Sequence, residues 1–203
     1  MLLIDVAQGG VEIRPIENLA RSTEFSECFF NDAVTPLDLT VGDVNGGWRV
    51  VLTTLGFERG SALMPIQLGM EREFDAMLDL ARLNGALDEP SIRRRLVDVH
   101  IGIRLMRATN LRVVADLLDV EASDPGVATA AASVTTKLFA STHHQRMGEL
   151  AMDILGAASL FGESGARADM RKLFLSTRAE TIYGGTAEIQ RNIASERLLG
   201  LPR

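Results

Sequence analysis

The 203-residue sequence predicts a mainly α protein, in which an antiparallel bundle of long helices follows a short remnant of a β domain. Two observations support this fold class. Apolar and polar residues alternate in the early part of the chain, whereas from Trp48 onward apolar residues recur with the three- and four-residue spacing of helices. Long helices joined by short loops pack as antiparallel bundles. We therefore expect an incomplete β region over residues 1–45 and a helical bundle domain over residues 46–203.

Strands and turns are expected in the β region. In "GGVEIRPI" apolar residues alternate with polar ones, and "FSECFFNDAVTP" is an apolar run that ends at Asn31 and Pro36. So little β structure needs a further surface to pack on, and the chain begins as if in mid-domain. Cys28, the single cysteine, excludes an internal disulfide and fits a reducing compartment. Its apolar neighbours indicate a packed core thiol.

Five helices are expected in the remainder of the chain. The first should be long, with a kink or a loosened turn at Pro65, and should stop at Gly85 in "NGALDEP". A loop, "GAASLFGESG", separates the third helix from the fourth, and two adjacent glycines precede the last. The expected helices cover residues 47–82, 90–118, 125–155, 168–182 and 187–199.

Composition excludes several classes of function. The net charge of −6 argues against sequence-independent binding to nucleic acid and against a basic helix on a membrane surface. The N-terminus lacks the pattern of a signal peptide, and no apolar run reaches the roughly 18 residues of a membrane span. A cytoplasmic protein is expected. His100, His143 and His144 lack metal-ligand spacing, so we expect no metal site and interpret them as surface or interface residues.

Glu58 is the first candidate catalytic residue. In one continuous helix it would share a stripe with Leu55 and Ile66, and would therefore project from an apolar face. Burial raises the pKa of a carboxylate, which suits a general base near neutral pH. From this pattern alone, a carboxylate at the edge of the stripe, in water or paired with an arginine, is the alternative.

Several segments together resemble the C-terminal half of a flavin-dependent acyl-CoA dehydrogenase. The segment "GGVEIRPIENLARSTEFSECFFNDAVTP" is similar to the last strands of that family's middle β domain, and "VGDVNGGWRVVLTTLGFERG" to the entry into its long first helix. The loop "ILGAASLFGE" is similar to a family loop that begins Ile-Leu-Gly-Gly, although the second glycine is Ala157 here. The tail "IYGGTAEIQRNIASERLLGLPR" resembles the family's C-terminal signature most specifically.

The resemblance implies a reaction and a base for it. These enzymes oxidise an acyl-CoA thioester between its α and β carbons, with a carboxylate as base and FAD as hydride acceptor. Many members carry the base in the tail as Tyr-Glu-Gly-Thr, where this chain has Gly184. Others carry it on the long helix in a Leu-x-x-Glu-Arg context, which matches Leu55 to Arg59 and implies that Glu58 is the base. Gly184 then leaves room for that carboxylate and offers its N–H to the thioester carbonyl.

The resemblance also implies a cofactor site and partners. The family's Arg-x-x-Phe-Gly motif, which touches the flavin of a neighbouring subunit, is only partly kept, because Asn84 replaces the phenylalanine and the arginine is shifted or lost. Implied partners are acyl-CoA, an electron-accepting flavoprotein, and further copies in a dimer or tetramer or a companion acyl-CoA dehydrogenase chain. The implied FAD-binding residues are Arg82, Gly156, Gly185, Thr186 and Glu188.

Much of the family's length has no counterpart in this sequence. A fragment, an incorrectly started reading frame and one piece of a split complex are the three explanations. The alternative to an enzyme is a structural subunit or inactive fragment whose helical bundle holds an oligomer together.

Overall fold

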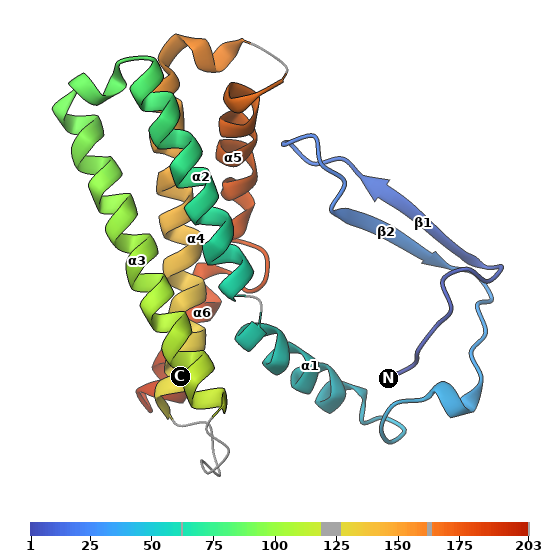
Figure 1. Cartoon of the computed structure of the whole chain (residues 1–203). Helices are drawn as coiled ribbons and strands as arrows, with labels where there is room; N and C mark the ends of the chain where they lie inside the picture. The colour runs from blue at the N-terminus through green and yellow to red at the C-terminus, as the bar shows by residue number, and fades with distance from the viewer. Residues whose placement is uncertain (62, 119–126, 162–163, 203) are drawn as a thin grey trace. The chain divides into compact units, whose positions relative to one another are not determined.

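A computed structural model describes residues 1–61, 63–118, 127–161 and 164–202 (Figure 1). The chain divides into two compact units, Met1–Arg59 and Gly60–Arg203, and each is described by itself. Helices dominate the second unit and a small sheet characterises the first, so the predicted fold class, a bundle of long helices preceded by a little β structure, is confirmed.

The sheet of the first unit has two antiparallel strands, β1 (Val11–Ile16) and β2 (Phe25–Phe30). Their register pairs Val11 with Phe30 and Ile16 with Phe25. Every residue of β2 is exposed, and so is every residue of β1 except Val11, which is half-buried. Cys28 is therefore exposed, and its interpretation as a core thiol is wrong. The apolar run forms a strand as expected, but the side chains of this strand are exposed in the described part of the chain.

The structure describes the predicted first long helix in two segments, α1 (Gly47–Ser61) and α2 (Leu63–Leu83), and residue 62 between them lies outside the described residues. Pro65 is the third residue of α2, and the expected kink or loosened turn at this proline stays a prediction. Two members of the expected apolar stripe are not buried. Leu55 and Ile66 are 39% and 40% exposed.

The second unit is a bundle in which α4 (Val127–Leu155) is the central helix, packed against α2, α3, α5 and α6. The helices α2 to α5 lie side by side in Figure 1, with α3 covering Pro90–Leu118 and α5 covering Ala166–Glu180. The last predicted helix is α6 (Ala187–Ile193), which continues as a π-helical turn, η4 (Ala194–Leu198). The predicted start of the third helix at residues 125 and 126 lies outside the described residues.

Short turns close the bundle at the residues that the sequence singled out. Gly85 has a left-handed backbone directly after α2, and Pro90 is the first residue of α3. A short 3₁₀ helix, η3 (Gly156–Leu160), follows α4, and η2 (Ala86–Asp88) precedes α3. The helix α5 begins two residues earlier than predicted and ends at Glu180, also two residues early. No described helix is both long and apolar enough for a membrane span.

Apolar side chains of four helices form one core. Met70 and Met77 of α2 are fully buried. Two glycines of the bundle lie where a helix comes close to its neighbour: a Cβ at Gly102 would lie 2.1 Å from the His143 ring, and one at Gly148 would lie 2.9 Å from the Phe174 backbone. Other members of the core are Leu80, Leu96, Ile103, Met106, Met147, Leu150, Ile154, Met170 and Leu173.

Candidate active site

The turn between α5 and α6 brings four of the candidate residues together: Gly184, Gly185, Thr186 and Glu188. Gly184 and Gly185 have φ angles of +63° and +94°, which side chains with a Cβ rarely adopt. A Cβ at Gly185 would also lie 2.4 Å from the amide nitrogen of Gln190. The adjacent glycines thus give a tight left-handed backbone path, as the sequence predicted for Gly185.

Hydrogen bonds fix both sides of this turn. The Gln190 amide donates to the Gly184 carbonyl at 3.2 Å, and the Ala187 N–H donates to the Thr181 carbonyl at 3.0 Å. The Thr186 hydroxyl accepts from the Ile189 N–H at 3.2 Å, so Thr186 caps α6. Within the described part of the chain, the Gly184 N–H has no acceptor. That N–H is consequently available to a ligand.

Lys137 of α4 contacts the turn from the side of the bundle. Its ammonium donates to the Glu180 carbonyl at 2.5 Å and lies 5.7 Å from the centre of the Tyr183 ring. Its Cε lies 3.5 Å from where a Cβ at Gly184 would stand. Burial lowers the pKa of Lys137, and the charge of Glu180 partly opposes that effect.

His144 links three helices through two carboxylates. Its Nδ1 donates to the Glu180 carboxylate of α5, with distances of 2.9 and 3.0 Å to the two oxygens, and its Nε2 donates to Glu73 of α2 at 2.6 Å. Burial alone would lower the pKa of His144, but the hydrogen bonds that the imidazole donates to Glu180 and Glu73 outweigh it and raise the pKa to about 9. The imidazole is therefore a cation at neutral pH. No described group of His, Cys, Asp and Glu has the arrangement of a metal site.

Glu188, in the first turn of α6, faces solvent rather than the bundle. Hydrogen bonds from its own backbone N–H and from the Thr186 hydroxyl lower the pKa of its carboxyl, and Arg191 lies 3.6 Å away. A carboxylate stabilised in this way is a weak base.

Arg82 and Gly156 lie at the other end of the bundle. Arg82, exposed at the end of α2, forms a 2.8 Å ion pair with Asp79, and Gly156 opens η3 with a φ of +54°. The Asn84 amide joins the two helix ends by donating to the Ile154 carbonyl at 2.7 Å. Lys137 and Ile154 are about 26 Å apart along α4, at about 1.5 Å per residue. The structure thus divides the expected cofactor residues into two groups at opposite ends of the bundle.

Glu58 belongs to α1, and its side chain lies outside the part of the chain whose side chains the structure describes. Its role as base stays a prediction.

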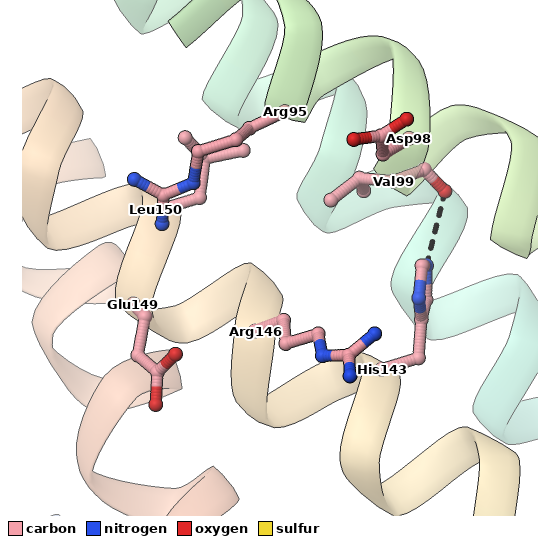
Figure 2. Close-up of a pocket in the computed structure, with 7 residues that line it drawn as sticks. All are labelled: Arg95, Asp98, Val99, His143, Arg146, Glu149 and Leu150. Carbon is pink, nitrogen blue, oxygen red and sulfur yellow. Dashed lines mark hydrogen bonds between the residues drawn. The ribbon is translucent and has the colours of Figure 1, made fainter. Parts of the chain in front are cut away.

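A groove of about 260 Å³ lies between α3 and α4, away from the turn (Figure 2). His143 closes one part of it, donating from Nε2 to the Val99 carbonyl at 3.0 Å and stacking on Phe139 with ring centres 5.2 Å apart. Burial lowers the pKa of His143, and the Val99 carbonyl partly opposes this. The groove is lined by Arg95, Asp98, Val99, His143, Arg146, Glu149 and Leu150.

Two of the three histidines interpreted as surface or interface residues are buried at contacts between helices. His143 and His144 are 7% and 9% exposed, whereas His100 is exposed. Sequence reasoning also missed Lys137 and Gln190. The available signal was the spacing of Lys137, Ser141 and His144, which puts the three on one face of a helix. Their partners come from other helices, which a single sequence does not reveal.

Comparison with known proteins defines the class of this chain. The family model described as "Acyl-CoA dehydrogenase, C-terminal domain" matches residues 45–199, so the chain belongs to the acyl-CoA dehydrogenase family. That finding confirms the resemblance noted in the tail motif and in the entry to the long helix.

Individual relatives cover the whole chain. Acyl-CoA dehydrogenase IpdE1 of Mycolicibacterium smegmatis is 45% identical over 100% of the chain and 49% of the relative's length. The protein of the same name from Mycobacterium tuberculosis is 42% identical, again over 100% of the chain and 50% of its own length. A solved structure, the Tcur3481-Tcur3483 steroid ACAD, superposes with a TM-score of 0.84 at 25% identity, over 100% of this chain and 52% of that one. The chain thus spans about half the length of the curated relatives it matches.

Proposed function

We propose that this chain is the base-bearing part of an FAD-dependent acyl-CoA dehydrogenase that oxidises an acyl-CoA thioester between its α and β carbons. In the proposed reaction the Glu58 carboxylate removes the α proton, and the β hydrogen leaves as hydride. The observation that carries the proposal is the glycine turn, where the tail signature of the family has Gly184 in place of a base, and where the Gly184 N–H has no acceptor among the described residues.

The carboxylates beside the turn are poor candidates for the base. Glu180 is held by His144 through both carboxylate oxygens, so its lone pairs are engaged. The pKa of Glu188 is lowered by hydrogen bonds, chiefly from its own N–H, and the side chain is exposed. A general base near neutral pH needs the opposite environment. This leaves Glu58, in the Leu55 to Arg59 context, as the base we propose.

The N–H of Gly184 is the proposed donor to the thioester carbonyl. Proton removal from the α carbon places negative charge on that oxygen, and a backbone donor held in place beforehand stabilises the charge. The Gly184 carbonyl is already fixed by Gln190, so the orientation of this part of the turn is constrained before substrate binds.

The residues of the turn fit a flavin. Gly185 leaves the turn without a side chain, and the buried Gln190 Oε1 beside it has no partner among the described residues. Gly185, Thr186 and Glu188 would hold the cofactor at this end, and Arg82 and Gly156 would do so from a neighbouring subunit, because they lie at the far end of the bundle. When bound, FAD supplies the hydride acceptor.

The relatives support a substrate class and a partner. Because the Tcur3481-Tcur3483 structure is described as a steroid ACAD, we infer a steroid-derived acyl group on the thioester. Its double name also supports a companion acyl-CoA dehydrogenase chain as the partner, in a homo-oligomer or a mixed one, with an electron-accepting flavoprotein to reoxidise the cofactor. The alternative function, a structural subunit of such an assembly, predicts a bundle that associates but has no base.

Flavin reduction in the assembled protein tests the proposal. Glu58→Gln keeps the size of the side chain and removes its basicity, so bleaching of the flavin by acyl-CoA should slow by about 10²–10⁴-fold. Glu149→Gln, at an exposed carboxylate to which we assign no part in the site, is the matched control and should reduce its flavin at nearly the parent rate. Equal rates for Glu58→Gln and the parent in stopped-flow measurements would show that the base is another residue. A colourless assembly that never binds flavin would contradict the FAD-dependent reaction itself.

A further inference from the structure

Four charged groups of alternating sign run from α2 across α4 to the glycine turn. They are Glu73 of α2, His144 of α4, Glu180 at the end of α5, and Lys137 of α4. The three steps measure 2.6 Å from Glu73 to His144, 2.9 Å from His144 to Glu180, and 2.5 Å from Lys137 to the Glu180 carbonyl. We call these four residues the charge chain.

The charge chain is partly withdrawn from solvent. His144 has a side-chain exposure of 11% and Glu180 of 18%, while Glu73 at 35% is the more open end. Attraction between opposite charges is stronger when water is partly excluded. Each carboxylate has a cationic neighbour and the imidazole has a carboxylate on each side, so no member is left buried without a counter-charge.

Glu180 is the member that couples the charge chain to the turn. It is the last residue of α5, its side chain is held by His144, and its carbonyl is held by Lys137. Four residues later the chain reaches Gly184, whose missing side chain leaves Lys137 within 3.5 Å of the Cβ position. Two glycines give a turn no stiffness of their own, because glycine has the largest conformational freedom of any residue. The position of the turn therefore depends on what holds its ends.

We propose that Glu73, His144 and Lys137 are positioning residues that hold the end of α5, and with it the Gly184 N–H, in the geometry that receives the thioester carbonyl. This inference rests on the proposed function of the Gly184 N–H. These residues do not touch the reacting atoms and act through Glu180. On the opposite side of the turn, Gln190 provides the second anchor by donating to the Gly184 carbonyl.

Hydrogen exchange tests the positioning role without any catalysis. In the assembled protein at neutral pH, His144→Gln should accelerate exchange of the amides of residues 181–186 by about tenfold or more, because one or two hydrogen bonds to charged groups are lost. Lys137→Met, which keeps the aliphatic stem, should do the same. Amides of the α3 core around Ile103 serve as the internal reference and should not change.

A matched control separates positioning from general loosening of α4 and α5. Glu149→Gln removes the exposed Arg178 pair between these same two helices, 2.9 Å long, and should leave exchange at the turn unchanged. The inference is overturned if His144→Gln leaves the turn unchanged, or if it accelerates the turn and the α3 reference equally. Where His144→Gln fails to fold, Glu73→Gln, which keeps the shape of the charge chain, is judged by the same criterion.

The pH profile provides a second readout. Deprotonation of His144, with its pKa of about 9, should loosen the turn, so kcat/KM for acyl-CoA should fall above that pH in the parent but not in His144→Gln. The groups that face His144 are Glu73 from α2 and Glu180 from α5, and His143 is its charged or neutral neighbour on α4. If His144 causes the fall in kcat/KM, Lys137→Met should still show it. A fall in kcat/KM that persists in His144→Gln contradicts the role given to His144.

Failure of this inference and failure of the proposed function give different results. If Glu58→Gln reduces its flavin normally but exchange at the turn responds to His144→Gln, the charge chain positions a turn with another function. If Glu58→Gln is impaired and the turn does not respond, the reaction stands and the positioning role is wrong.

Discussion

The two units of this chain treat their apolar residues in opposite ways. In the bundle, residues such as Met70, Met147 and Leu150 are fully buried, and several helices contribute to one core. In the sheet, Phe25, Phe29 and Phe30 are all exposed although the pattern of their strand is that of a half-buried one. A two-stranded sheet has no second layer of its own. Apolar periodicity therefore predicted secondary structure in both units. It predicted burial only in the bundle, where the partner elements belong to the same unit.

This difference bears on how the proposed site is built. The bundle fixes the glycine turn with the charge chain, Gln190 and Thr186, all within one unit. The proposed base is carried by α1, at the boundary between the units.

The largest expected effect tests whether the base can be moved from one unit to the other. In the Glu58→Gln background, Gly184→Glu should recover at least about tenfold in the rate of flavin reduction, because both positions would serve the same α carbon. Recovery should be incomplete, since a φ of +63° costs a residue with a Cβ about 1–2 kcal/mol. Space is not the obstacle, because the nearest atom to the new Cβ, the Lys137 Cε, is at 3.5 Å. Gly184→Gln in the same background is the control, and recovery with that neutral side chain contradicts the prediction.

A second prediction concerns the close packing that only the bundle has. Gly102→Ala should lower the free energy of unfolding by about 1–3 kcal/mol, because its Cβ would stand 2.1 Å from the His143 ring and force it away from Val99. Gly69→Ala is the matched control, since nothing lies within 4 Å of that Cβ, and it should stabilise α2 by up to about 1 kcal/mol. Denaturant unfolding of both variants, and of the double variant Gly102→Ala with His143→Ala, measures the energy of the clash. If the losses in free energy of unfolding simply add in the double variant, there is no clash with the His143 ring.

Much of the fold was predictable because its signals are local. Gly85, Pro90 and Thr186 mark helix ends through backbone conformation, a missing N–H and a side-chain cap, and each acts within a few residues. Burial was less predictable, because it depends on other elements: Ile66 has helical spacing but is 40% exposed.

The site was predictable only in its sequence-adjacent part. Gly184, Gly185 and Thr186 are neighbours in the chain, so the turn was visible as a motif. His144 finds its partners 36 and 71 residues away, at Glu180 and Glu73, and only the packing of three helices brings them together. For Cys28 the strand was predicted correctly, but its burial was not, because a strand prediction does not determine whether the strand is covered.

A third prediction uses the charge of the buried histidine. The pKa of His144 rises from 6.5 to about 9 on folding, so its contribution to stability is fully present below pH 6.5 and is lost as pH rises through about 9. We expect a loss of about 1–2 kcal/mol in the free energy of unfolding between pH 7 and 10. Lys137 opposes it, because its pKa is lowered on folding. The difference between parent and His144→Gln isolates the histidine, and parallel curves for the two proteins contradict the prediction.

The smallest expected effect on stability lies in the sheet, because its side chains are already exposed. Cys28 is exposed on β2, opposite Ile13 in the register, and no described residue packs over it. Cys28→Ser should therefore change the free energy of unfolding by less than about 0.5 kcal/mol, as for other exposed substitutions. The thiol should also react with a small thiol reagent in the folded protein at nearly its rate in denaturant. A larger loss of stability, or protection of the thiol in an assembly that also contains the companion chain, would mean that a partner covers this strand. Comparing the isolated chain with that assembly would then identify the sheet, rather than the bundle, as the surface that is completed on association.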